Sequence, residues 1–338
     1  MKPIARPMAL VAAACLACLA GTASAQAVTE LKLSTAAPAG SPWAKQIDRL
    51  AADVAAETNN SVKISIFYNS QLGTENDVLA QLMRGRVDMG IFTTGSVALQ
   101  IPEAILPGLY HYYDSAPQRD CILDKHVLRP YAEAIAPKGM QMLGWYEVGS
   151  GQFSGKKPFA SPDDIRGLKV GVTTNKAINL FFQTYGAIPV ATPIAEATSN
   201  IGTGLIDVYP TVPAFYVPSG LNKVAPVWSI SNYSWQPAAL VMSTRAWSAL
   251  TPEQRAGIER GVAKVPAAQI RTEIAAAEKF MINKHKEGGG QVVETTPELQ
   301  AAWKKPMAGY YKELTKELGP NGQKMFALME AGKKACGQ

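Results

Sequence analysis

Histidine and cysteine are scarce in this chain of 338 residues. None of its three histidines, His111, His126 and His285, lies in the His-Glu-x-x-His spacing that binds catalytic zinc. Of the four cysteines, two lie in the first 25 residues, and Cys121 and Cys336 are far apart. We therefore expect no metal site, and no motif indicates a cofactor.

The chain also lacks a strong excess of either charge. Its formal net charge is +6, and removing residues 1–25 takes away two of the 33 basic residues and none of the 27 acidic ones, which leaves +4. Its lysine and arginine pairs are scattered, whereas a nucleic-acid-binding protein usually carries a basic stripe or block. We expect no nucleic-acid partner. Beyond the N-terminal segment, no stretch approaches the eighteen apolar residues of a membrane span.

Signatures of catalysis are missing as well. The nucleophile motif Gly-x-Ser-x-Gly does not occur, and the Ser-x-x-Lys match at 154–157 lacks its companion motifs. The glycine-rich stretch 149–155 has neither the dinucleotide-binding nor the P-loop spacing, and we interpret it as a flexible connection between lobes. We expect no catalytic residues. The absences favour a protein that captures a molecule over one that converts it.

The N-terminus has the three parts of a secretory signal peptide. Lys2 and Arg6 precede an apolar run at Met8–Ala20, which is followed by the small residues Ala23-Ser24-Ala25. We predict cleavage after Ala25 and export to the periplasm. Two alternatives are a buried N-terminal helix and a lipid anchor through Cys18, whose preceding residues fit a lipobox poorly.

Two cysteines remain after cleavage, in an oxidising compartment. A disulfide between Cys121 and Cys336 would tie the C-terminal end to the body of the protein. Two separate free thiols are the alternative, because the sequence does not supply the geometry that a disulfide requires.

The mature chain alternates strands and helices in two successive halves. Each half has a helix that exits through glycine, with aspartate three residues later: Gly85 with Asp88, and Gly204 with Asp207. This alternation predicts two lobes of similar β/α construction with mainly parallel sheets. The strands are expected at about 30–34, 62–68, 87–92, 168–172, 187–191 and 205–209, and the helices at about 41–58, 75–84, 175–184 and 194–203.

The last third of the chain changes character. A strand is expected at 235–242, and a long helix from the cap Thr251 towards Glu287, kinked or broken at Pro266. Terminal helices follow a short strand at 291–294.

An ordered set of motifs covers nearly the whole mature chain. It consists of Tyr68-Asn69-Ser70-Gln71-Leu72-Gly73, the segment 81–90, Lys157-Pro158-Phe159, the segment 161–170, Gly204-Leu205-Ile206-Asp207 and the segment 247–253. In this order the chain resembles the solute receptors of tripartite ATP-independent periplasmic (TRAP) transporters, of the DctP type.

The resemblance implies an α/β, periplasmic binding protein-like fold, with two β/α lobes joined by crossing strands and a long lobe-spanning helix. We assign residues 1–25 to the signal peptide, 26–147 plus about 235–265 to lobe I, and 148–234 plus about 266–338 to lobe II. Hinges are expected near 144–149 and 235–242. The implied partners are a small-molecule ligand and the TRAP membrane permease subunits; the oligomeric state cannot be read from the sequence, and a monomer is favoured.

One departure from the family concerns the ligand. In the family that the chain resembles, the motif Gly-Leu-Lys-Val/Ile is usually followed by an arginine that binds the ligand carboxylate through two hydrogen bonds. Gly171 stands at that position here, and Asp207 is followed by Val208-Tyr209-Pro210 instead of a polar run. We therefore expect a small organic molecule with an aromatic or branched apolar part, such as a monocarboxylate held by backbone N–H groups at the helix start near Thr173.

The candidate ligand contacts combine aromatic walls with polar groups near the strand ends. Glu147, a hinge carboxylate, is either paired structurally or binds a hydroxyl or cationic group of the ligand, and we favour the structural role. The candidates are Trp43, Gln71, Thr93, Thr94, Ser96, Trp145, Glu147, Gly171, Thr173, Asn175, Tyr209, Thr211, Phe215, Tyr233 and Trp235.

Two other functions remain open at this point. An exported enzyme would use Glu147, or Glu75 with Asp88, as an acid–base pair. A ligand receptor for a sensor kinase would share the fold but not the permease.

Overall fold

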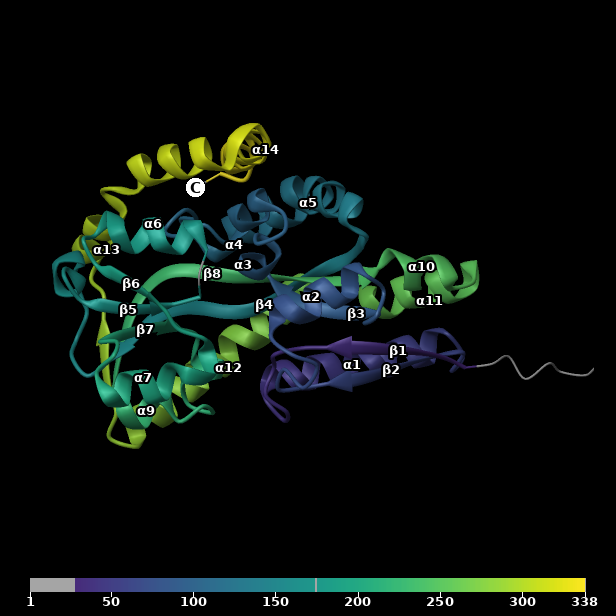
Figure 1. Cartoon of the computed structure of the whole chain (residues 1–338), viewed down its shortest axis with the longest axis horizontal. Coiled ribbons are helices and arrows are strands. Elements are labelled where there is room, and N and C mark those ends of the chain that lie inside the picture. Colours follow the sequence, from purple (N-terminus) through teal and green to yellow (C-terminus); the bar gives the residue numbers. More distant parts are fainter. Residues whose placement is uncertain (1–27, 174, 338) are drawn as a thin grey trace, which may run out of the picture.

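The computed structural model describes residues 28–173 and 175–337, so the predicted signal peptide lies outside the described residues. Figure 1 shows strands that run through the length of the molecule with helices on both sides. The strands are β1 (Thr29–Ser34), β2 (Val62–Phe67), β3 (Met89–Thr93), β4 (Met140–Gly155), β5 (Lys169–Val172), β6 (Ile188–Ala191), β7 (Val208–Thr211), β8 (Val227–Ser243) and β9 (Gln291–Glu294).

Helices fill most of the remaining chain. The α-helices are α1 (Pro42–Glu57), α2 (Glu75–Met83), α3 (Thr94–Val97), α4 (Ala116–Cys121), α5 (Leu128–Ile135), α6 (Lys176–Thr184), α7 (Ala197–Thr203), α8 (Pro213–Tyr216), α9 (Leu221–Val224), α10 (Thr244–Ala249), α11 (Pro252–Ala263), α12 (Ala267–Glu287), α13 (Pro297–Lys304) and α14 (Met307–Ala335). The described residues also form four 3₁₀ turns and one π-helical turn. The 3₁₀ turns are η1 (Pro102–Gly108), η3 (Ala136–Lys138), η4 (Pro162–Ile165) and η5 (Ile194–Glu196), and the π-helical turn is η2 (Ile122–Val127). None of the helices in the described ranges is both long enough and apolar enough to cross a membrane.

The strands form one mixed sheet in the order β2-β1-β3-β8-β4-β7-β5-β6, with β9 paired to β8. Pairing is parallel among β1, β2 and β3 and among β5, β6 and β7, as the alternation of strands and helices predicts. The two halves are joined by the long strands β4 and β8, which pair antiparallel to each other. This arrangement agrees with the two lobes and crossing strands expected from the sequence.

The glycine-rich stretch 149–155 is part of strand β4, so its interpretation as a flexible connection was wrong. The strand carries three register shifts, and one of them lies between Glu147 and Gly149. At Gly151 a Cβ atom would lie 2.4 Å from Ser234 Oγ and 2.7 Å from the ring of Tyr233. Glycine is required there because neighbouring side chains lie directly on the backbone.

Local capping explains where the helices begin. Ser41 caps α1 by accepting a hydrogen bond from Ala44 N (3.1 Å), with Pro42 at the first helical position. Thr251 and Gln254 form a reciprocal capping box at the start of α11. The chain breaks at Pro266, and α12 begins at the next residue.

The two helix exits that the sequence singled out have the same construction. Gly85 (φ 69°) and Gly204 (φ 77°) adopt the left-handed conformation that glycine allows. Asp88 then accepts a hydrogen bond from Lys32 N in β1 (2.8 Å), and Asp207 accepts one from Lys169 N in β5 (2.9 Å). Each aspartate therefore joins the exit of a helix to the neighbouring parallel strand in its own lobe.

Helix α12 packs against both lobes. Ile270 and Ile274 belong to the apolar cluster that contains α1 and the strands β1 and β3, while Ile282 belongs to a cluster with Tyr216 and Trp228. Figure 1 shows α12 passing below the long strands between the two halves.

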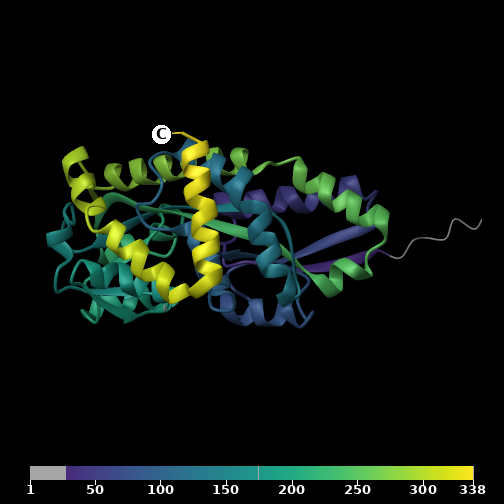
Figure 2. The ribbon, with the colours of Figure 1, turned by 90° about the horizontal axis from the view of Figure 1, so that it is seen from above.

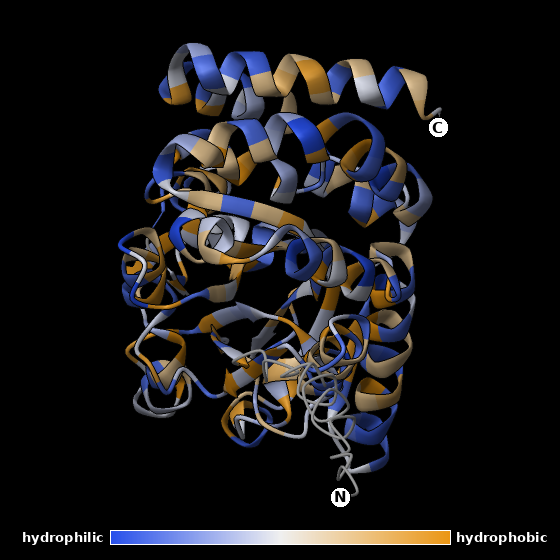
Figure 3. Cartoon of the chain, turned by 90° about the vertical axis from the view of Figure 1, so that its right-hand side faces the viewer, coloured by the Kyte–Doolittle hydropathy of each residue, from blue (hydrophilic) through white to orange (hydrophobic). Residues whose placement is uncertain are grey.

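The C-terminal helix α14 lies on the side of the molecule opposite α12, where it packs against α6, η1 and η2. It bends at Gly319 (φ 69°), and Figure 2 shows its two arms meeting at an angle. Met325 and Met329 are buried in the largest apolar cluster, and Figure 3 shows apolar and polar residues alternating along the helix. At its end Cys336 is bonded to Cys121 of α4.

Candidate functional site

The two lobes approach each other at the starts of α3 and α6. Asn175 Nδ2 lies 3.4 Å from the position that a Cβ atom on Gly95 would take, and Thr93 Oγ1 lies 3.9 Å from it. Asn175 caps α6 with its Oδ1, which accepts from Ile178 N (2.9 Å), so its amide N–H₂ is directed away from its own helix. The structure thus brings Thr93 and Asn175 together across the lobes.

The predicted hydroxyl groups of Thr93 and Ser96 form hydrogen bonds with another residue of the first lobe. Thr93 Oγ1 (3.0 Å) and Ser96 Oγ (2.7 Å) both donate to Glu75, the first residue of α2. Burial raises the pKa of Glu75, and these hydrogen bonds oppose the shift. Thr94 is buried, with its Oγ1 2.8 Å from where a Cβ on Gly108 would be. The sequence named Thr93 and Ser96 as candidate ligand contacts. It did not predict that Glu75 would bind their hydroxyl groups.

The predicted anion-binding start of α6 is accessible. Thr173 is exposed, and Lys176 is exposed with its Nζ 4.0 Å from Glu317. Gln71 is exposed at the turn after β2.

The position of the usual arginine is filled by other side chains. Gly171 is buried in β5, and a Cβ there would lie 2.5 Å from Ile206 Cδ1, 2.9 Å from Tyr209 Cδ2 and 3.1 Å from Thr192 Oγ1. None of these three nearest atoms belongs to an arginine. Burial raises the pKa of Tyr209, so its hydroxyl stays neutral over the physiological range.

Trp43 and Phe215 come from different lobes and share one apolar cluster. The cluster also contains Tyr146 and Val148 of β4 and Val212, which follows β7. Trp43 is 4% exposed, and its indole Nε1 is buried without a hydrogen-bond partner. Thr211 is buried at the end of β7, opposite Gln152 of β4.

Three of the predicted aromatics lie in or against the other large cluster. Trp145 Nε1 donates to Leu123 O (3.2 Å), and its ring packs against Tyr131, so Trp145 does not face Trp43. Tyr233 stacks on Phe153, with 4.9 Å between ring centroids. Trp235 lies under the guanidinium of Arg119, 5.3 Å from the ring centroid.

A buried network of charges surrounds strand β4, where the resemblance to the family places a hinge. Arg119 Nη1 lies 3.0 Å from Glu147 Oε2, without the alignment of a hydrogen bond, and Arg119 also pairs with Asp120 (2.8 Å). Glu147 is 3% exposed, and its burial raises its pKa while Arg119 opposes the shift. Glu147 therefore has the structural partner that we favoured. Sequence reasoning missed Arg119 because nothing in the local sequence indicates that it folds onto β4.

The end of β4 is also bonded to α12. Both oxygens of Glu278 accept from Ser150, one from its backbone N–H and one from its hydroxyl, each at 2.8 Å. On the same helix Arg271 makes a two-fold ion pair with Asp124 (2.8 Å for each bond). No sequence motif indicated either contact.

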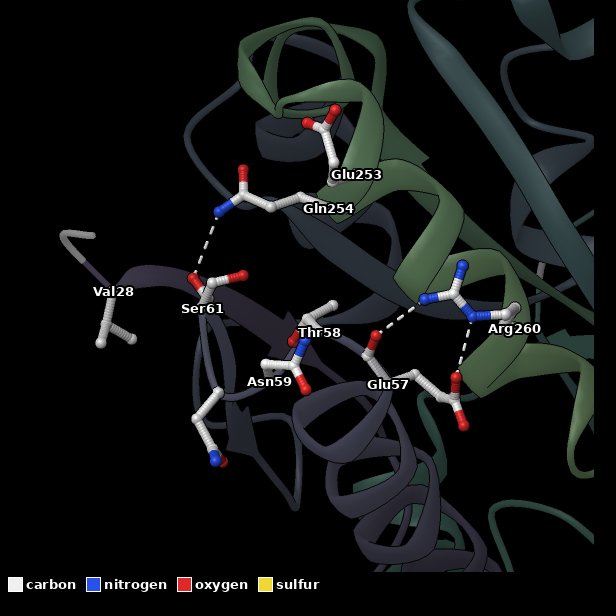
Figure 4. Close-up of a pocket in the computed structure, with 9 residues that line it drawn as sticks. Val28, Glu57, Thr58, Asn59, Ser61, Glu253, Gln254 and Arg260 are labelled. Carbon is white, nitrogen blue, oxygen red and sulfur yellow. Dashed lines mark hydrogen bonds and ion pairs between the residues drawn. The ribbon is translucent and has the colours of Figure 1, made fainter. Parts of the chain in front are cut away.

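Two pockets are present in the described part of the chain, one remote from this region and one beside it. Figure 4 shows one of about 650 Å³ at the far end of lobe I, where Glu57 is paired with Arg260 at 2.8 Å. Its lining residues are Val28, Glu57, Thr58, Asn59, Asn60, Ser61, Glu253, Gln254 and Arg260. The second, of about 300 Å³, lies beside the break at Pro266. Trp145 is the one candidate ligand contact among its lining residues.

One group of residues has the composition of a metal site. Cys121, His126 and Cys336 place their potential ligand atoms within 4.8 Å of one another. The two sulfur atoms are bonded to each other, so they do not provide the thiolates that a metal requires.

The long crossing strands, the lobe-spanning helix and the meeting of polar strand ends define a two-lobed α/β solute receptor. Residues 33–318 match the model of the bacterial extracellular solute-binding proteins of family 7, DctP, and the chain belongs to that family. Members of this family bind solutes and are not enzymes, so the acid–base interpretation of Glu147, Glu75 and Asp88 is wrong.

Several relatives are similar over most of the chain. A solute-binding protein of Chromohalobacter salexigens is 28% identical over 224 residues, which is 65% of this chain and 66% of that protein. The C4-dicarboxylate-binding periplasmic protein DctP of Rhodobacter capsulatus is 23% identical over 78% of this chain and 79% of its own length. The sugar acid binding protein DctPAm of Advenella mimigardefordensis, solved in complex with galactonate, superposes with a TM-score of 0.85 at 21% identity, covering 91% of this chain and 99% of that one.

Proposed function

We propose that this chain is the extracytoplasmic receptor of a TRAP transporter, which captures a small organic solute between its lobes and delivers it to the membrane permease. The family and the crossing-strand fold support this role. The approach of the Asn175 side chain to the backbone at Gly95 supports a binding site between the lobes. The N-terminal charge, apolar run and small-residue site support export to the periplasm.

We further propose that the solute is an organic acid with an aromatic or branched apolar part. The observation that carries this proposal is the filling of the space at Gly171 by Tyr209 and Ile206. Those side chains are uncharged, so they cannot replace the charge-assisted contact that an arginine makes with a carboxylate. Phe215 is only partly buried against the apolar cluster that contains Trp43, and the exposed Thr173 just before α6 is where backbone N–H groups would hold one carboxylate.

A thermal-shift screen tests the class of solute. We expect benzoate, phenylacetate and branched-chain 2-oxo acids to raise the unfolding temperature, because a ligand at one hundred times its Kd adds about 2.7 kcal/mol. Galactonate, galacturonate and succinate, at equal concentration, serve as the comparison set. Stabilisation by the comparison set alone would contradict the aromatic or branched part of the proposal but leave the receptor role intact.

Substituting arginine at Gly171 tests whether this position governs the solute. We expect Gly171→Arg to lower the free energy of unfolding by about 1–3 kcal/mol, because its side chain must displace Ile206 and Tyr209. We also expect it to weaken the binding of apolar acids, or to change the preference towards dicarboxylates. Unfolding temperature and calorimetric titration with the acids found in the screen provide the two measurements.

Gly202→Arg is the matched control, because no atom lies within 4 Å of where a Cβ on this α7 glycine would be. It should leave binding unchanged. If Gly171→Arg behaves like Gly202→Arg in both measurements, Gly171 does not line the solute site.

A further inference from the structure

Helix α12 is attached to the rest of the protein at three places along its length. At its beginning Gln46 Nε2 donates to Ile270 O (3.2 Å), and Arg49 pairs with Glu273 (2.8 Å). At its end His285 Nε2 lies 3.0 Å from Pro226 O. Between these, Glu278 binds the hinge strand. Because the β-bulge between Glu147 and Gly149 lies at the expected hinge and directly precedes Ser150, we expect a bend of β4 there to alter its fit against the middle of α12.

The contact between Glu278 and strand β4 depends on a close approach of the carboxyl group to the backbone at Gly149. The side chain is 9% exposed, and its two oxygens accept both hydrogen-bond donors of Ser150. A Cβ on Gly149 would lie only 2.1 Å from Glu278 Oε1, and Gly149 has a φ of 134°. Only glycine at this bulge lets the carboxyl group reach the strand.

The charges that act on Glu278 are those of Glu147 on β4 and Arg119 on α4, which belong to a larger network. Glu147 on β4, Asp120 on α4 and Asp124 on η2 face two guanidinium groups, Arg119 on α4 and Arg271 on α12. The phenol of Tyr113, before α4, is neutral. Glu147 and Arg119 carry opposite charges, so an ionised Glu278 would add an unbalanced negative charge beside this pair.

Glu278 is bonded differently from the other acids of this network. Its two oxygens contact only the neutral Ser150, whereas Asp124 has a two-fold bond with Arg271 and Glu147 is paired with Arg119. Burial raises the pKa of Glu278 from 4.5 to about 8, helped by Glu147 and opposed by the hydrogen bonds of Ser150 and by Arg119.

We infer that Glu278 is a positioning residue for solute capture: as a neutral carboxylic acid it holds α12 against the hinge strand, so that closing of the lobes takes up one proton. This inference rests on the proposed receptor function. In the open arrangement water reaches the carboxyl group, which ionises and releases its proton to solvent. On closing, one proton returns from solvent to the carboxylate oxygen, and no other bond changes.

The sign of the pH effect follows from the raised pKa. The stabilisation of the arrangement seen here is complete below the ordinary pKa of 4.5, declines as pH rises between 4.5 and about 8, and is absent above that range. One proton taken up over this interval corresponds to a change of up to about tenfold per pH unit in the ratio of closed to open molecules.

Distances between nitroxide labels on the two lobes test the inference without any solute. The labels go on Lys63→Cys in β2 and Lys223→Cys in α9, both exposed, with the Cys121–Cys336 disulfide intact. We expect pulsed electron paramagnetic resonance to show the short-distance population growing as pH falls from 8.5 to 5.5. In the same labelled protein, Glu278→Gln should hold that population high at every pH, because glutamine keeps an acceptor for Ser150 and cannot ionise.

Glu273→Gln is the control on the same helix, since Glu273 is about one-third exposed and pairs with Arg49. It should keep the pH dependence of the parent protein. Infrared spectra in D₂O provide a second measurement: the band of a protonated carboxyl group at neutral pH should disappear in Glu278→Gln. A pH-independent distance distribution in the parent, or an unchanged pH dependence or an unchanged carboxyl band in Glu278→Gln, would overturn the inference. A failure of every solute in the thermal-shift screen would count against the proposed function and would leave these measurements interpretable.

Discussion

Replacing Arg119 with alanine is expected to lower the free energy of unfolding by about 3–5 kcal/mol, because it leaves a buried carboxylate without its cation. Glu147 is 3% exposed, and besides this ion pair it accepts a hydrogen bond from Gly149 N (3.1 Å). The substitution also removes the guanidinium that lies over Trp235. Chemical denaturation at pH 7 measures the loss, and the slope of the transition shows whether the compactness of either state has changed.

Two variants separate the ion pair from the packing. Arg119→Met together with Glu147→Gln removes both charges while keeping similar volumes, and should recover a large part of the lost stability. Arg129→Ala breaks an exposed pair with Glu133 and should cost less than about 0.5 kcal/mol. Equal losses for Arg119→Ala and Arg129→Ala would mean that the hinge network is hydrated and contributes little.

Opening the disulfide between Cys121 and Cys336 should have an effect of similar size. The bond links residues separated by 215 positions, so the closed loop of the unfolded chain is long and its restriction is strong. We expect Cys121→Ser with Cys336→Ser to lower the free energy of unfolding by about 2–5 kcal/mol. Reducing the native protein should produce the same loss together with a mass gain of two hydrogens.

The remaining contacts of α14 should keep the helix in place after the bond is removed. Glu330 accepts from Tyr112 (2.7 Å), and Lys333 Nζ lies 3.0 Å from Asp114. Circular dichroism should therefore show unchanged helix content at 20 °C in the double variant. Adding reductant to that variant is the control and should change nothing. If reduction leaves both the mass and the stability of the parent unchanged, the two thiols are not paired.

Local sequence was sufficient wherever a structure depends on neighbours along the chain. The cap at Thr251 and the break at Pro266 were predicted correctly, because capping bonds and the geometry of proline act between residues a few positions apart. The matched glycine–aspartate exits at Gly85 and Gly204 also followed from local chemistry.

Long strands with bulges were the part that local sequence described poorly. Strand β4 was divided between a hinge and a flexible glycine stretch, since glycine ordinarily disfavours strands. Its glycines are explained by Glu278, Tyr233 and Ser234, which come from distant parts of the chain and lie on its backbone. A side chain's long-range contacts are invisible to any reading of its immediate neighbours.

The sequence by itself determined the family, the two β/α lobes, the predicted exported character and the absence of the usual arginine at Gly171. These properties follow from composition, spacing and ordered motifs. The tertiary structure alone decided what fills that position and how the hinge is held: Tyr209 and Ile206 occupy the space, and Arg119, Glu147 and Glu278 meet around β4. The physical reason is that burial and pairing energies depend on distances between elements, which are fixed only when strands and helices from all parts of the chain pack together.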